Sequence, residues 1–102
     1  MMRPPKYLMN AEIEFEAYLG NTAYGPSYDL PVSADVYIEP TNKLTTDYEG
    51  QEVVPEYLVI VRDDIDIPIK SKATYEGKEY EVINSTKYRP LNTFSHLEVY
   101  LR

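Results

Sequence analysis

Carboxylates are the residues of this chain whose spacing could support acid–base chemistry. Glu12, Glu14 and Glu16 alternate with apolar residues, so in a strand they share one face, about 7 Å apart at two residues' rise. That separation overlaps the carboxyl separations of glycoside hydrolases. An active site would also need a cleft and carboxyl pKa values pushed apart, so the pattern favours a solvated strand face.

Three aspartates near the middle of the chain offer oxygen ligands of the kind that Ca²⁺ prefers. Asp63, Asp64 and Asp66 directly follow an apolar run. A calcium loop of the EF-hand type also needs a central glycine and a late glutamate in register, and this run has neither. The interpretation that the pattern favours is an acidic turn beside a core strand.

His96 is the only histidine, and it lies between Ser95 and a nearby Glu98. A catalytic triad needs an acid, a base and a nucleophile that converge from different parts of the fold, so this local grouping is not sufficient. The favoured interpretation is a histidine on a strand surface. The four glycines form no phosphate-binding loop. The sequence therefore predicts no catalytic residue, no metal site and no cofactor.

The composition excludes several classes of protein. The chain has 102 residues, a formal net charge of −7, no Cys and no Trp. A disulfide framework, a Cys-ligated zinc site and a thiol nucleophile are therefore excluded. We expect one domain over residues 1–102, with a flexible N-terminal segment at residues 1–8 and neither a signal peptide nor a spanning helix. The net negative charge argues against binding nucleic acid through its phosphates, because only Lys70, Lys72 and Lys78 come close to forming a basic cluster in the sequence.

Period-two alternation predicts the first two strands. Residues 9–19 place Met, Ala, Ile, Phe, Ala and Leu on one side and mostly Glu on the other. Their Ala, Leu and Glu content leaves a helix as the alternative. Residues 32–39 repeat the alternation up to a proline. Between these segments, residues 20–31 are rich in Gly, Pro, Asn and Ser, which predicts a loop at the tip of a hairpin.

The second half of the chain predicts four more strands. Residues 53–62 are apolar and β-branched, and the run at 58–61 predicts a core strand that is covered on both faces. Residues 72–75 and 78–84 flank a Glu-Gly turn as a hairpin, and residues 95–101 alternate again. The fold class is therefore all-β, a small β-barrel or sandwich of about six short antiparallel strands with long loops.

Tyrosine is unusually frequent, with eleven residues. Tyr24, Tyr28 and Tyr48 lie in predicted loops with few apolar neighbours. A large ring in such a place either packs back on its own domain or meets a partner. Tyr24 and Tyr28 are the candidate partner contacts.

Five short segments carry a resemblance to a known family. They are DYEGQEVV at 47–54, the strand at 57–61, IPI at 67–69, the hairpin YEGKEYEVI at 75–83 and HLEVYL at 96–101. From Val36 onward, their order resembles that of the small head-closure proteins of tailed phages, also called stoppers, and of related phage minor capsid proteins. One departure is Lys70-Ser71, where such proteins usually carry Gly-Asp before the last hairpin.

The resemblance implies a β-barrel subunit that forms a ring beneath the portal and adaptor, closes the DNA channel after packaging and gives the tail a docking surface. In that family a loop of each subunit projects into the channel, and an ordinary hairpin tip is the alternative interpretation of the matching segment here. The candidate channel loop consists of Thr41, Asn42, Lys43, Leu44, Thr45, Thr46, Asp47, Tyr48, Glu49, Gly50 and Gln51.

The partners implied are the phage adaptor and portal complex, the tail-completion proteins and further copies of the chain in a ring. DNA would pass without sequence-specific binding, and no membrane is involved. The protein would be made in the cytoplasm of a bacterial host and would reside in the virion, at the head–tail interface. The alternative function is an acidic, DNA-mimicking inhibitor of a nucleic-acid enzyme, against which the ten interspersed basic residues argue.

Overall fold

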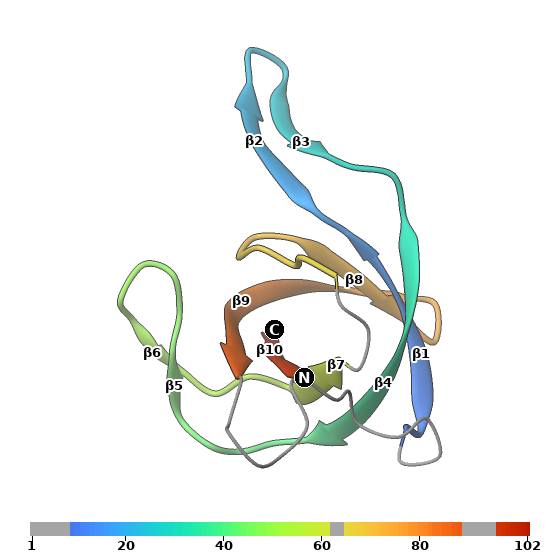
Figure 1. Ribbon diagram of the computed structural model, residues 1–102. Helices are drawn as coiled ribbons and strands as arrows, with labels where there is room; N and C mark the ends of the chain where they lie inside the picture. The colour runs from blue at the N-terminus through green and yellow to red at the C-terminus, as the bar shows by residue number, and fades with distance from the viewer. Residues whose placement is uncertain (1–8, 62–64, 89–95) are drawn as a thin grey trace.

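Strands alone make up the regular structure of the computed structural model, which describes residues 9–61, 65–88 and 96–102 (Figure 1). They are β1 (Ala11–Glu16), β2 (Tyr18–Thr22), β3 (Gly25–Tyr28), β4 (Val32–Pro40), β5 (Thr45–Thr46), β6 (Glu52–Val53), β7 (Tyr57–Val61), β8 (Lys72–Tyr75), β9 (Lys78–Tyr88) and β10 (His96–Leu101). In these three ranges there is no helix long and apolar enough to cross a membrane. Residues 1–8, expected to be flexible, lie outside the described residues.

Six of the strands close into an antiparallel barrel. Their order is β1-β4-β7-β10-β9-β8, and β8 pairs back with β1. Each of the six segments expected to be a strand contributes one strand to this barrel, so the prediction of a small all-β barrel is confirmed. Closure leaves the barrel without an unpaired sheet edge.

The core lies inside the barrel, where alternate residues of each strand meet. In β1, Ile13 and Phe15 are buried while Glu12 and Glu14 face outward and are exposed. The alternation is therefore a strand, and the helix alternative is wrong. The buried apolar residues are Ile13, Phe15, Ala34, Val36, Ile38, Val59, Val61, Ile67, Ala73, Tyr80, Val82, Ile83, Leu97, Val99 and Leu101.

A bulge explains why two consecutive residues of β9 are both buried. Tyr100 pairs with Asn84 and Leu101 pairs with Val82, so Ile83 is an extra residue on its strand. Such a bulge breaks the alternation and bends the strand. Val82 and Ile83 are consequently almost fully buried, at 0% and 1% exposure.

The β8–β9 hairpin turns at the predicted Glu-Gly pair. Glu76 and Gly77 both have positive φ, at 52° and 78°, the conformation that a two-residue hairpin turn requires. Gly77 adopts it without strain because it has no side chain. Tyr57 packs edge-on against Tyr75 and Tyr80, with ring centroids 5.8 and 5.5 Å apart, and supports this hairpin.

The first predicted strand is shorter than its alternation suggests. Residues 9–19 were expected to form one strand, but β1 ends at Glu16, whose pairing with Lys72 is the last with β8. Beyond this point the chain leaves the barrel, and Leu19 is 62% exposed instead of buried. The alternation continues in the sequence, but the barrel offers no partner strand beyond its rim.

The strand predicted at 53–62 is also shorter, and it is covered on one face only. β7 begins at Tyr57, and Val54 is 57% exposed. Val59 and Val61 are fully buried, whereas Leu58 and Ile60 are half-buried on the outer face. The expectation of cover on both faces was wrong because no second layer packs on this side of the described barrel.

Candidate functional site in two hairpins outside the barrel

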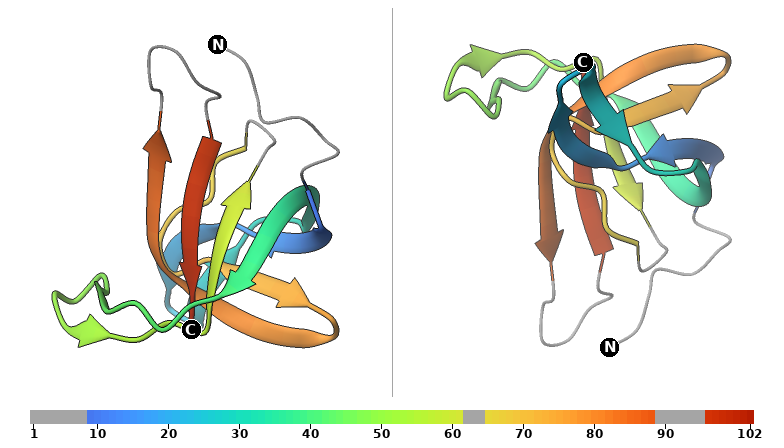
Figure 2. Two further views of the ribbon diagram at one scale, coloured as in Figure 1. Left: turned by 90° about the horizontal axis from the view of Figure 1, so that it is seen from below. Right: turned by 90° about the horizontal axis from the view of Figure 1, so that it is seen from above.

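Two hairpins extend from the barrel and hold the candidate partner-contact and channel-loop residues. We call residues 18–28 the arm, which is the sheet of β2 and β3, and residues 41–56 the side loop, which contains β5 and β6. The arm and the side loop leave the barrel in different directions (Figure 1), and the two further views agree (Figure 2). The expected loop at 20–31 is therefore largely a paired hairpin.

The arm is a short ladder that carries no charged residue. Thr22 pairs with Gly25 across the tip, and the Thr22 hydroxyl donates to the Gly25 carbonyl at 2.9 Å. Tyr24 is fully exposed at this tip, at 102%. In a chain with 26% charged residues, this uncharged hairpin thus ends in an exposed aromatic ring.

The base of the arm is fixed to the barrel. Buried Ser71 accepts the Tyr18 backbone N–H on its Oγ at 3.0 Å, and Asp29 N–H donates to the Ala17 carbonyl at 2.8 Å. The Tyr28 ring packs edge-on against Tyr18 at 5.9 Å. Of the two candidate contacts, Tyr24 is thus presented outward, whereas Tyr28 is half-buried against its own chain.

The side loop turns around Asp47. Its Oδ1 accepts the backbone N–H groups of Glu49 and Gln51, both at 2.9 Å, and the Asp47 and Gln51 backbones also bond to each other. Gly50 completes the turn with a φ of +81°, which an L side chain rarely adopts. The Asp47 side chain is 2% exposed, so the turn has a buried polar centre.

Side-chain contacts tie this turn to the barrel. Arg102 Nη1 lies 3.3 Å from Asp47 Oδ2, and its Nη2 lies 2.7 Å from Glu81 Oε1. The Tyr48 hydroxyl donates to Glu81 Oε2 at 2.8 Å, which raises the pKa of Tyr48. The Lys70 ammonium lies 5.2 Å from the centre of the Tyr48 ring. The second half of the candidate channel loop is therefore docked, not free.

The first half of the candidate channel loop is the exposed part. Asn42, Lys43 and Leu44 are all exposed, and Leu44 retains 54% of its accessible surface. This part is exposed, and it is polar except for the apolar side chain of Leu44, whereas Asp47 in the second half is buried. The two halves of the loop therefore differ in exposure and in their contacts with the barrel, although they are adjacent in sequence.

Amide hydrogen exchange should separate the two halves. The Asp47, Gly50 and Gln51 amides are hydrogen-bonded, so we expect them to exchange at least about tenfold more slowly than those of Asn42 and Leu44. Exchange measured by NMR at neutral pH checks this. Uniformly fast exchange across residues 41–51 would show that the Asp47 turn does not persist in solution.

Acid should loosen the Asp47 turn. The pKa of Asp47 lies below its ordinary value of 3.8, first because its carboxylate accepts the Gln51 N–H and further because of Glu49 and Arg102. A lowered folded-state pKa means that the carboxylate stabilises the turn above the ordinary value and that this contribution is lost as the pH falls through the folded value. We expect the Glu49 and Gln51 amide resonances to titrate below pH 3.8, and those of Asp47→Asn not to. A transition at or above that pH would contradict the geometry.

The structure does not assemble the other candidates into a site. Glu12 and Glu14 lie on the solvent face of β1, as expected. His96 pairs with its strand neighbour Glu98, with Nε2 and Oε2 3.0 Å apart. Asp63, Asp64 and Ser95 lie outside the described residues. Within the described ranges, no three His, Cys, Asp or Glu side chains are grouped so as to hold a metal ion.

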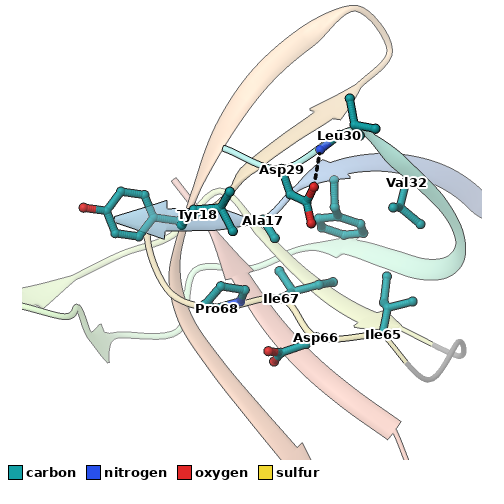
Figure 3. Close-up of a pocket in the computed structure, with 11 residues that line it drawn as sticks. Ala17, Tyr18, Asp29, Leu30, Val32, Ile65, Asp66, Ile67 and Pro68 are labelled. Atoms are coloured by element: carbon teal, nitrogen blue, oxygen red, sulfur yellow. Dashed lines mark hydrogen bonds between the residues drawn. The ribbon is translucent and has the colours of Figure 1, made fainter. Parts of the chain in front are cut away.

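A pocket of about 380 Å³ lies at the base of the arm, and the sequence did not predict it (Figure 3). It is lined by Phe15, Ala17, Tyr18, Leu19, Asp29, Leu30, Val32, Ile65, Asp66, Ile67 and Pro68. Three segments far apart in sequence meet here, and this explains why no local pattern indicated it. Leu30 and Val32 are 80% and 49% exposed, so the apolar lining is open to solvent.

Comparisons with known proteins place this chain in no family. No protein-family model matches it, and no curated protein matches it. The class that the structure defines is an antiparallel six-stranded barrel with an uncharged arm, an acidic side loop and an apolar pocket between the arm and the barrel.

Proposed function

We propose that this chain is a structural protein of a tailed-phage neck, a head-closure (stopper) subunit with no catalytic step. In this role it forms a ring, seals the DNA channel after packaging and provides the docking surface for the tail. The observation that carries the proposal is the closed barrel whose side loop, between β4 and β7, extends outside it. The resemblance of residues 36–101 to head-closure proteins assigns the channel loop to this same segment.

The segments that carry the resemblance support the proposal by their places in the barrel. Residues 47–54 contain the docked turn and β6 of the side loop, which extends from the barrel, and residues 57–61 are β7. Residues 75–83 form the β8–β9 hairpin, and residues 96–101 are β10. Each of these motifs is short and carries little information alone. Together they lie in the barrel strands and in the loop that extends from them, as a shared fold would require.

The charge of the chain is compatible with a channel through which DNA passes. A ring of subunits with a charge of −7 each repels phosphates and leaves the duplex free to move. Its partners are the adaptor and portal complex on one side and the tail-completion proteins on the other. The ring lies at the head–tail interface of the virion and needs no membrane.

The alternative, a DNA-mimicking inhibitor, fits the surface less well. A mimic needs carboxylates spaced along an uninterrupted face. Here Arg102 contacts both Asp47 and Glu81, and a lysine approaches each of two further glutamates, Glu56 at 3.7 Å and Glu79 at 3.9 Å. Basic side chains therefore interrupt the acidic surface.

The location of the protein distinguishes the two functions. Mass spectrometry of purified virions, and of DNA-filled heads from a tail-deficient mutant, should find the chain in both at a constant ratio to the portal protein. A chain that is absent from both particles but inhibits a purified nuclease would support the inhibitor and contradict the neck protein.

A further inference from the structure

The lining of the pocket at the base of the arm suits a tyrosine side chain. Its walls are mainly apolar, with Phe15 and Ile67 behind and Val32 and Leu30 at the opening. The carboxylates of Asp29 and Asp66 lie on either side of it (Figure 3). An apolar cavity with acceptor oxygens at its edge fits an aromatic ring that ends in a hydroxyl donor.

The arm presents a matching side chain. Tyr24 is fully exposed at the tip, between the small residues Ala23 and Gly25. The arm as a whole is composed of Tyr, Ser, Gly, Asn, Thr, Ala, Leu and Pro. Tyr, Ser, Gly and Asn are also the residues that dominate antibody contact loops, where tyrosine gives large contact area at low entropic cost.

A Tyr24 side chain cannot reach the pocket of its own chain. The pocket adjoins the base of the arm at Tyr18, whereas Tyr24 lies beyond Thr22 at the other end of the β2–β3 ladder. Four residues of strand separate these ends by roughly 13 Å. Tyr24 could therefore enter only the pocket of another copy of the chain.

The charge of the chain favours the arm of a second copy as the segment that brings a tyrosine to the pocket. Each copy has a net charge of −7, so contacts between copies cost least where the approaching surface is uncharged. The side loop carries four acidic residues and one lysine, and Asp29 and Asp66 would repel it. The arm carries no charge, and its tyrosine hydroxyl can donate a hydrogen bond to Asp66 or to Asp29, whose Oδ1 already accepts the Leu30 N–H at 2.8 Å.

We propose that Tyr24 of one copy inserts into the arm-base pocket of a second copy and donates a hydrogen bond to Asp29 or Asp66. The inference deepens the proposed function, since a ring needs a contact between copies. The contact itself is a property of the purified chain and can be tested without a phage.

Cysteine crosslinking tests the contact, because the natural chain has no cysteine. Two single-cysteine variants, Ala23→Cys beside the anchor and Leu30→Cys at the pocket, are mixed at millimolar concentration and oxidised. We expect the mixed disulfide to form roughly tenfold faster than that between Ala23→Cys and Leu44→Cys, which places an exposed cysteine on the side loop. Adding Tyr24→Ala to the Ala23→Cys chain should remove this preference.

Two controls keep the result interpretable. Thermal unfolding of every variant must match the parent chain, as expected for changes at exposed positions. Tyr24→Phe keeps the ring and loses the donor, so it should lower the crosslinking rate by less than Tyr24→Ala does. Equal rates at Leu30→Cys and Leu44→Cys, or a preference that survives Tyr24→Ala, would overturn this contact. Neither outcome would decide whether the chain belongs to a phage neck, because that depends on its presence in particles.

Discussion

Truncation of Ile13 to alanine should destabilise the barrel by about 2 to 5 kcal/mol, the range for removing a buried isoleucine side chain. Ile13 has no exposed surface and lies in β1, which pairs with β4 on one side and β8 on the other. The cavity would therefore lie where the barrel closes. Equilibrium unfolding in urea measures the loss, with an unchanged dependence on denaturant as the sign that the barrel still unfolds as a unit.

Ile60→Ala is the matched control, because it removes the same atoms from the outer face of β7. Ile60 is half-buried, so we expect a loss of about 1 kcal/mol, near the centre of the range for single substitutions. Equal losses at Ile13 and Ile60 would contradict the inward and outward faces described for this barrel.

Replacement of residues 42–51 by a short Gly-Ser turn should leave a folded barrel that fails in the phage particle. None of the six barrel strands includes this segment. Arg102 loses Asp47 but keeps Glu81 at 2.7 Å, and a change of loop length alters the closure entropy by only about 0.6 kcal/mol per doubling. The cooperative unfolding transition should therefore persist.

The defect should be one of closure. In a phage deleted for the gene and supplied with the shortened variant, we expect heads that join tails but lose their packaged DNA. The matched variant, Asn42→Ser, changes the same segment without shortening it and should retain the DNA. Full DNA retention by the shortened variant would show that the side loop does not close the channel. Residues 20–31 would then be the next candidate for closure.

Alternation predicted three of the barrel strands, whereas an apolar run and a turn predicted the other three. In β1, β4 and β10, every second residue is apolar because a small closed barrel buries one face of each strand and leaves the other in water. The alternation failed at Leu19, and the apolar run failed at residues 53–56, because both patterns extend past the end of the barrel pairing. A strand leaves the barrel where its neighbouring strands end, and the local sequence pattern carries no information about its neighbours.

The contacts of the candidate site could not be predicted in the same way. Asp47 meets Arg102 across 55 positions, and Tyr48 meets Glu81 across 33. Nothing in the local sequence distinguishes these residues from the other acids and tyrosines of the chain. Tyr24 was a candidate because a large ring stood among small polar residues. It is fully exposed, and its contact with a partner stays a prediction. The pocket is formed by three separate segments of the chain, so no local sequence pattern could predict it.

The addition of purified chain while heads assembled without it are packaged with DNA in vitro tests the proposed head-closure function most directly. DNA retained in the heads is measured by nuclease protection, and tail joining is measured by recovered infectivity. We predict that heads without the chain release their DNA, and that added chain restores both retention and tail joining in proportion to its occupancy of the portal vertex. Heads that retain their DNA and join tails equally well without the chain would contradict the account.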